Sequence, residues 1–240
     1  MDISTILYAL VGLHAAYLIQ LAFRQPSNKV ISTKTESWPM WLAASPIGMV
    51  FARILILAIA IQQGIIALSL SDALPQSDEM LNTVCLTPRY LDPQLFTWSK
   101  ATAVSLALLY LGCYIRFQAY AQLGADFTYR IAKPDQLVTS GLYAHVRHPS
   151  YTGLFMVLMG TYSLFLRQRG IISCWVPLLD ERLVTDEMHA SLVPAIGFTC
   201  VVYMFMVRRV REEEAMMERE FGETWKQYKA RTKKFVPGVY

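Results

Sequence analysis

Long runs without a charged residue constrain this chain most. Five such runs cover residues 3–23, 54–71, 101–115, 149–166 and 188–207. The hydrocarbon core of a bilayer is about 30 Å thick and is spanned by about 20 apolar helical residues. The third run is shorter, but its apolar pattern extends from residue 95 to residue 123. The pattern predicts an all-α polytopic membrane protein with about five transmembrane helices.

The composition excludes several other classes of protein. Charged residues make up only 17% of the 240 residues, whereas a typical soluble domain has about 25%. A disordered chain and an ordinary water-soluble enzyme are therefore not expected. The net charge of +4 does not indicate nucleic-acid binding, because the basic residues flank apolar runs. The four cysteines are Cys85, Cys113, Cys174 and Cys200. They lie far apart and form no CxxC pair, so we expect neither a metal site nor a disulfide framework.

The positions of lysine and arginine predict the orientation in the membrane. Cytosolic loops of membrane proteins carry an excess of both residues. The loops 24–38 and 116–148 are basic, and the tail 208–240 holds nine basic residues. We therefore expect these three segments in the cytosol, and the loops 72–94 and 167–187 on the opposite side. Three arginines in the last of these loops reduce the contrast.

A first polar segment, residues 137–153, runs directly into the fourth apolar run. It reads LVTSGLYAHVRHPSYTG. Pro149 is suited to the first turn of a helix, where a missing N–H costs nothing. The start of a helix offers free N–H groups and a partial positive charge to an acceptor group. Gly141 and Gly153 permit a close approach of the backbone.

Three side chains of this segment combine a ring with a hydrogen-bonding tip, namely Tyr143, His148 and Tyr151. One interpretation is an aromatic belt at the membrane surface. The other is a binding site. A belt needs no fixed order of residues, so the string from Arg147 to Tyr151 favours the binding site.

A second polar segment follows the fifth run and reads RRVREEEA, residues 208–215. Arg209 and Glu213 are separated by four positions and share one face if the helix continues. The alternative is a solvated helix with compensating charges. Acidic residues close to a bilayer are costly unless they serve a partner, and a cationic cofactor would be such a partner.

The tail after this segment contains Phe221, Gly222, Trp225 and Tyr228. The glycine predicts a break between two helices. We expect Trp225 and Tyr228, which follow the glycine, to have a role in structural packing.

Together the two polar segments resemble the isoprenylcysteine carboxyl methyltransferase family. The matching stretches are residues 137–153 and 209–228. Their Arg-His-Pro-x-Tyr string alone also occurs in other membrane methyltransferases and in some sterol reductases. The combination with Glu213-Glu214 and Phe221-Gly222 is more specific. No glycine-rich loop of the soluble Rossmann methyltransferases is present, which agrees with a separate membrane class.

The resemblance implies a multi-pass enzyme of the endoplasmic reticulum membrane with a cytosolic C-terminal tail. It implies that S-adenosyl-L-methionine methylates the C-terminal carboxylate of prenylated cysteine. The substrates would be prenylated CaaX-type proteins or small prenylcysteine compounds. Residues 1–110 would form an N-terminal transmembrane scaffold, and residues 111–240 the methyltransferase core with a C-terminal helical cap.

The resemblance also implies roles for individual residues. Arg209 matches the position that contacts the substrate and is the expected catalytic residue. The expected cofactor-binding residues are Asp135, Gln136, Leu137, Val138, Tyr143, His148, Pro149, Ser150, Tyr151 and Glu213.

Methyl transfer to a carboxylate is compatible with these residue types. A carboxylate nucleophile has a pKa of about 3–4 and is already ionised at neutral pH, so no general base is required. Arg209 could orient it by a forked hydrogen bond. Glu213 could hold the ammonium group of the cofactor or offset its sulfonium charge. His148 is expected to make a hydrogen bond rather than to act as a base.

Three alternatives remain open from the sequence. The first is a membrane methyltransferase for another lipid, either a phospholipid amine or a small terpenoid acid. The second is a non-catalytic membrane scaffold. The third is an NADPH-dependent relative of sterol reductases, which Glu213 and Glu214 disfavour because a phosphorylated cofactor prefers cations.

Overall fold

The computed structural model describes residues 3–24, 46–71, 76–127, 134–178, 187–236 and 238. The helices are α1 (Ile3–Ala22), α3 (Pro46–Leu70), α4 (Ser77–Val84), α5 (Lys100–Leu123), α6 (Pro149–Phe165) and α8 (Glu187–Arg231). Short 3₁₀ helices connect them: η1 (Pro88–Tyr90), η2 (Pro93–Phe96), η3 (Gly124–Asp126), η4 (Gly141–Ala144) and η5 (Ile171–Leu178). Within these described ranges there is no β-strand, and the predicted all-α fold is confirmed.

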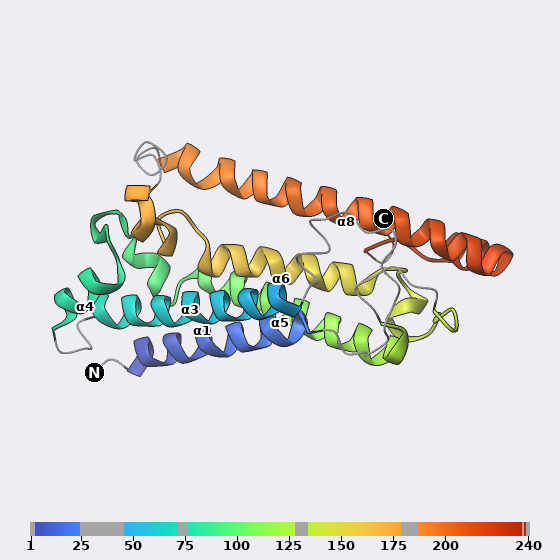
Figure 1. The fold of residues 1–240 in the computed structure, drawn as a ribbon, viewed down its shortest axis with the longest axis horizontal. Helices are drawn as coiled ribbons and strands as arrows, with labels where there is room; N and C mark the ends of the chain where they lie inside the picture. The colour runs from blue at the N-terminus through green and yellow to red at the C-terminus, as the bar shows by residue number, and fades with distance from the viewer. Residues whose placement is uncertain are drawn as a thin grey trace.

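Four of the described helices have the length and composition to cross a membrane. They lie in Ile3–Ala22, Val50–Leu70, Lys100–Asp126 and Leu192–Arg231. The expected span that is not among them is the fourth, α6, which has 17 residues and lies alongside α5 in the bundle (Figure 1). Large apolar side chains point outward from the helices, as expected of a surface in contact with lipid (Leu10, Phe51, Ile54, Leu111 and Phe205). The chain is therefore a multi-pass membrane protein.

Glycines allow α5 and α6 to pack at short range. A methyl group added at Gly153 would lie 2.7 Å from the carbonyl oxygen of Gly112, and one at Gly112 would lie 2.8 Å from that of Gly153. A methyl group added at Gly160 would likewise lie 2.8 Å from the carbonyl oxygen of Ser105. The close approach expected at Gly153 is confirmed, and it fixes the start of α6 against α5.

The helices define two opposite ends of the bundle. At one end, the indole of Trp98 donates to the carbonyl oxygen of Ser4 at 3.0 Å, and the Tyr8 hydroxyl donates to that of Leu95 at 2.9 Å. The other end holds the C-terminus of α1, the C-terminus of α5 and the N-terminus of α6 (Figure 1). The described helix ends that flank the segments 24–38 and 116–148 therefore lie at the same end of the bundle.

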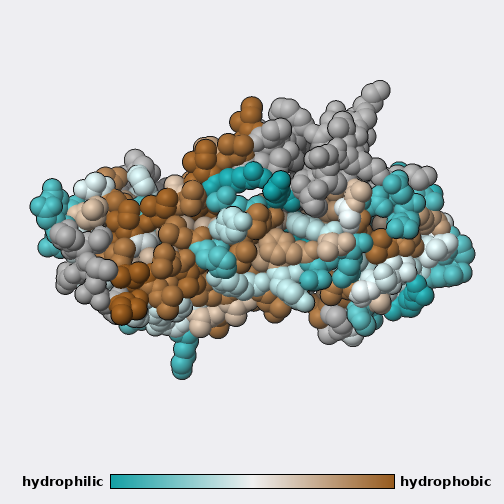
Figure 2. Space-filling model, turned by 90° about the horizontal axis from the view of Figure 1, so that it is seen from below, coloured by the Kyte–Doolittle hydropathy of each residue, from teal (hydrophilic) through white to brown (hydrophobic). Residues whose placement is uncertain are grey.

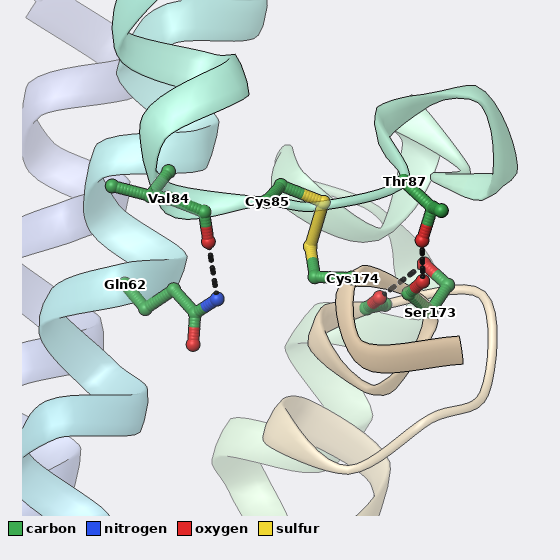
Figure 3. Close-up of a disulfide and its surroundings, with 7 residues drawn as sticks. Gln62, Val84, Cys85, Thr87, Ser173 and Cys174 are labelled. Atoms are coloured by element: carbon green, nitrogen blue, oxygen red, sulfur yellow. Dashed lines mark hydrogen bonds between the residues drawn. A yellow bond between two sulfur atoms is a disulfide. The ribbon is translucent and has the colours of Figure 1, made fainter. Parts of the chain in front are cut away.

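The first end is closed by a disulfide between Cys85 and Cys174, both buried (Figure 3). Beside it, Thr87 donates a hydrogen bond to the carbonyl oxygen of Ser173 at 2.5 Å. The expectation of no disulfide was wrong. The two cysteines are 89 positions apart, and only the folding of the helices brings them together.

Helix α8 has an apolar half up to Val207 and a charged half from Arg208 onward. At Gly222 the backbone has φ 51° and ψ −119°, so the predicted break is a kink inside one long helix. Beyond it, Trp225 and Tyr228 are 1% and 2% exposed, which confirms their expected packing. In the view of Figure 2, apolar side chains gather over the left half and hydrophilic ones at the right end, where the charged half of α8 lies.

Several basic residues on which the predicted membrane orientation depends lie outside the described residues. They are Lys29, Lys34, Arg130, Lys133 and Arg182. The division of the chain after residue 110 falls inside α5 and stays a prediction.

Candidate active site

The site is built where the start of α6 meets the charged half of α8. His148 precedes the helix and Pro149 occupies its first turn, as the sequence predicted. Both residues are buried. Arg147 and His148 donate their backbone N–H groups to the carbonyl oxygens of Lys233 and Lys234, at 2.8 and 3.1 Å. The C-terminal segment is thereby tied across the loop that leads into α6.

A cavity of about 180 Å³ lies between these segments. It is lined by residues from α5, α6, α8 and the stretches that join them. The lining residues are Arg116, Leu123, Asp126, Phe127, Pro134, Gln136, Leu137, Val138, Tyr143, Arg147, His148, Ser150, Tyr151, Leu154, Arg209, Glu213, Met216, Met217, Trp225 and Tyr228. Both polar segments singled out in the sequence therefore contribute to one cavity.

Most of the expected site residues lie on its wall. They are Gln136, Leu137, Val138, Tyr143, His148, Ser150, Tyr151, Arg209 and Glu213. Asp135 and Pro149 are not brought to the wall. Asp135 donates its backbone N–H to Asp126 Oδ1 at 3.1 Å, and Pro149 is fully buried in the first turn of α6.

A direct hydrogen bond joins the two segments at the cavity. The hydroxyl of Tyr151 donates to Glu213 Oε2 at 2.9 Å. Arg209 precedes Glu213 by one helical turn and also lines the cavity, as their spacing predicted. A carboxylate and a guanidinium thus face the same space.

The neighbouring carboxylate, Glu214, has a different role. Its Oε1 accepts from Arg147 Nε at 3.0 Å and lies 3.2 Å from His148 Nε2, while Lys229 Nζ is 3.9 Å from Oε2. Burial acts to raise the pKa of Glu214, but the hydrogen bonds and charges of His148 and Arg147 lower it to about 2. Glu214 is therefore an ionised anchor that holds the loop before α6 against α8.

Arg116 forms part of the floor of the cavity and was not expected from the sequence. It is buried, and it donates to the carbonyl oxygen of Ala22 at 2.5 Å and to Ser150 Oγ at 3.1 Å. Its guanidinium lies 5.0 Å from the centre of the Tyr120 ring. Arginines commonly flank apolar helices, so the sequence alone does not distinguish Arg116 from a residue at the membrane surface.

Tyr143 connects the cavity wall to the C-terminal segment. Its carbonyl oxygen accepts a hydrogen bond from the Tyr228 hydroxyl at 2.7 Å. Burial, followed by the nearby Glu213 and Tyr228, raises the pKa of Tyr143 well above its ordinary value. Its hydroxyl therefore stays protonated at neutral pH.

Among the described residues there is no cluster of three His, Cys, Asp or Glu side chains that could hold a metal ion.

Comparison with known proteins finds a family whose sequence model covers part of this cavity. A sequence model described as "Isoprenylcysteine carboxyl methyltransferase (ICMT) family" matches residues 105–189. The match includes the segment before α6 and ends before Arg209.

Curated proteins named protein-S-isoprenylcysteine O-methyltransferase are also similar. The one from Schizosaccharomyces pombe is 30% identical over 146 residues, which are 59% of this chain and 52% of the relative. That from Dictyostelium discoideum is 25% identical over 155 residues, covering 63% and 55%, and that from Homo sapiens is 28% identical over 147 residues, covering 60% and 43%. The chain thus spans about half the length of these relatives. The predicted resemblance is confirmed: residues 105–189 match the sequence model of the isoprenylcysteine carboxyl methyltransferase family.

Proposed function

We propose that this protein methylates the C-terminal carboxylate of prenylated cysteine, with S-adenosyl-L-methionine as the methyl donor. The observation that carries the proposal is the single cavity between the start of α6 and the charged half of α8, in which Tyr151 contacts Glu213 and Arg209 lines the same wall. The names of the relatives supply the substrate class.

The residues of the cavity fit such a cofactor. Glu213 offers a carboxylate to its ammonium or sulfonium group, and Ser150 and Tyr151 offer hydroxyl groups at the start of α6. Gln136, Leu137 and Val138 supply an amide and apolar contacts on the facing stretch. When bound, S-adenosyl-L-methionine supplies an electrophilic methyl group on a positively charged sulfur.

The chain's own residues would align the reacting groups and exclude water. Arg209 would orient the substrate carboxylate by paired hydrogen bonds without removing its negative charge. No residue needs to act as a base, because the carboxylate is ionised at neutral pH. Holding two reactants in line can lower the barrier by several kcal/mol. His148, whose Nε2 lies 3.2 Å from Glu214, would position the loop rather than take a proton.

The prenyl group would reach the cavity from the lipid, between α6 and α8. These helices touch where Tyr162 stacks on Phe198, with ring centres 4.8 Å apart. Closer to the charged half of α8, Leu154 lines the cavity. Apolar side chains of α8 such as Tyr203 and Met204 face outward, toward the position of the lipid.

We place the cavity end in the cytosol and the opposite end in the lumen of the endoplasmic reticulum. The basic tail supports the first assignment. The bridge between Cys85 and Cys174 supports the second, because disulfides persist in oxidising compartments.

A methyl-transfer assay tests the proposal. The purified full chain would be incubated with labelled S-adenosyl-L-methionine and, in parallel, with N-acetyl farnesylcysteine, N-acetyl geranylgeranylcysteine and phosphatidylethanolamine. We expect a base-labile methyl ester on one or both prenylcysteine compounds. A label that survives mild alkali and appears on the phospholipid would instead identify an N-methyltransferase, and absence of any labelled product would reject the proposal.

A further inference from the structure

Trp225 has an unexplained polar group at the cavity. The residue follows the kink at Gly222, is 1% exposed and lines the cavity. Among the residues that the structure describes, its indole Nε1 is buried and has no hydrogen-bond acceptor. A buried donor without a partner loses its hydration without compensation. Such a group in a folded protein calls for an explanation, and a ligand acceptor in the cavity is one.

The surroundings of Trp225 indicate which part of a ligand would lie there. The ring of Tyr228 is 5.6 Å away, and its hydroxyl is already used in a bond to the carbonyl oxygen of Tyr143. Met216 and Met217, which precede the kink in α8, line the same cavity. Aromatic and thioether side chains contact flat rings favourably and do not compensate a buried charge.

Most charged groups of the cavity come from other parts of its wall. Arg209 and Glu213 belong to α8 before the kink, Arg116 to α5 and Asp126 to η3. Arg147, from the loop before α6, does reach the carbonyl oxygens of Lys229 and Thr232 beyond the kink, but its charge is already paired with Glu214 at 3.0 Å. These groups are suited to the charged amino-acid part of a cofactor and to a substrate carboxylate. The wall formed beyond Gly222 is suited to a neutral ring that carries acceptor atoms.

We propose that the indole N–H of Trp225 donates a hydrogen bond to a ring nitrogen of the adenine base of S-adenosyl-L-methionine. The proposal rests on the function proposed above. It assigns the base to the segment beyond Gly222 and the amino-acid part to the wall that contains Glu213. The acceptor of the indole N–H would be a neutral ring nitrogen. Burying a neutral acceptor among apolar side chains costs less than burying a charged one.

Calorimetry with S-adenosylhomocysteine and the purified full chain tests this assignment. Replacing Trp225 by phenylalanine (W225F) keeps an aromatic ring and removes the N–H. We expect the Kd to rise by about 5- to 30-fold. The matched control is W98F, which removes an indole N–H bonded to the Ser4 carbonyl oxygen at the opposite end of the bundle and leaves the Kd unchanged.

A set of ligands identifies the acceptor and does not depend on the variant being well packed. The 1-deaza, 3-deaza and 7-deaza analogues of S-adenosylhomocysteine each lack one ring nitrogen. The wild-type protein is expected to lose about the same 5- to 30-fold for one of them, and W225F is expected to bind that analogue and the parent ligand equally. Replacing Trp225 by β-(3-benzothienyl)alanine, which exchanges only the N–H for sulfur, should match W225F.

The outcomes separate this inference from the proposed function. If wild type binds S-adenosylhomocysteine and folded W225F binds it as tightly, the inference is overturned while the cofactor proposal stands. The inference also fails if W225F weakens all three analogues and the parent by the same factor, because the indole would then contact a sugar or carboxylate oxygen. If wild type does not bind the ligand at all, the proposed function itself fails.

Discussion

Tyr151 and Glu213, 62 positions apart in the chain, are joined by a hydrogen bond of 2.9 Å across the cavity. One residue belongs to the first turns of α6 and the other to the charged half of α8. Their contact brings together the two segments that carry the family resemblance. A substitution at either residue therefore also removes a hydrogen-bond partner from the opposite wall of the cavity.

The anchoring carboxylate Glu214 predicts a pH-dependent contribution to stability. Replacing it by glutamine (E214Q) should lower the free energy of unfolding by about 1–3 kcal/mol at pH 7. The negative charge that strengthens the hydrogen bonds to Arg147 and His148 would be lost. Since the pKa of Glu214 in the folded protein is lowered from 4.5 to about 2, its contribution is fully present above pH 4.5. It is lost as the pH falls from 4.5 toward 2.

The measurement is the difference in thermal midpoint between wild type and E214Q in detergent, from pH 7 down to pH 2.5. The difference should shrink as the pH falls below 4.5. The exposed Glu218 on the same helix provides the control, because E218Q should stay within about 0.5 kcal/mol of wild type. A difference between wild type and E214Q that does not change with pH would contradict the anchoring role.

The contact between α5 and α6 predicts that added methyl groups are not tolerated. Replacing Gly153 by alanine should destabilise the protein by about 1–3 kcal/mol, because the new carbon would lie 2.7 Å from a backbone oxygen of α5. Replacing Gly197 by alanine adds the same group where nothing lies within 4 Å, and should be neutral or stabilise α8 by up to about 1 kcal/mol. Thermal unfolding of the two variants distinguishes the sites, and equal effects would mean that the helices are not in close contact.

The disulfide predicts the number of thiols that react in the denatured protein. The chain has four cysteines, of which Cys113 and Cys200 are free. Protein isolated under non-reducing conditions should therefore take up maleimide-polyethylene glycol at two sites, and at all four sites after reduction. The C85S variant provides the comparison: its unpaired Cys174 should react without reduction. Four reactive thiols in unreduced wild-type protein would show that the bridge between Cys85 and Cys174 does not form.

The sequence was sufficient for the parts of the structure that depend on local patterns. The charge-free runs predicted the apolar helices, because the thickness of a bilayer fixes the number of residues that span it. Pro149 marked the start of α6, and the spacing of Arg209 and Glu213 predicted a shared face. These inferences need only residues that are neighbours in the chain or on one helix.

The parts that were missed depend on contacts between distant segments. Cys85 and Cys174 are 89 positions apart and meet only in the folded protein. Arg116 reads as a flanking residue of an apolar run, and only its bonds to Ala22 and Ser150 place it beneath the cavity. The resemblance gave a role to Glu213 but none to Glu214, and only the structure shows that Glu213 lines the cavity while Glu214 accepts from Arg147.

Binding of S-adenosylhomocysteine to a set of four proteins tests the central claim most directly, namely that the start of α6 and the charged half of α8 enclose one cofactor site. The set comprises wild type, Y151F, E213Q and the double variant, with E218Q as the control. We expect each single change to raise the Kd by about tenfold or more, the double change to cost less than the sum, and E218Q to bind as wild type does. A shared cofactor site between α6 and α8 is contradicted if wild type shows no binding, or if Y151F and E213Q both bind the ligand as tightly as wild type.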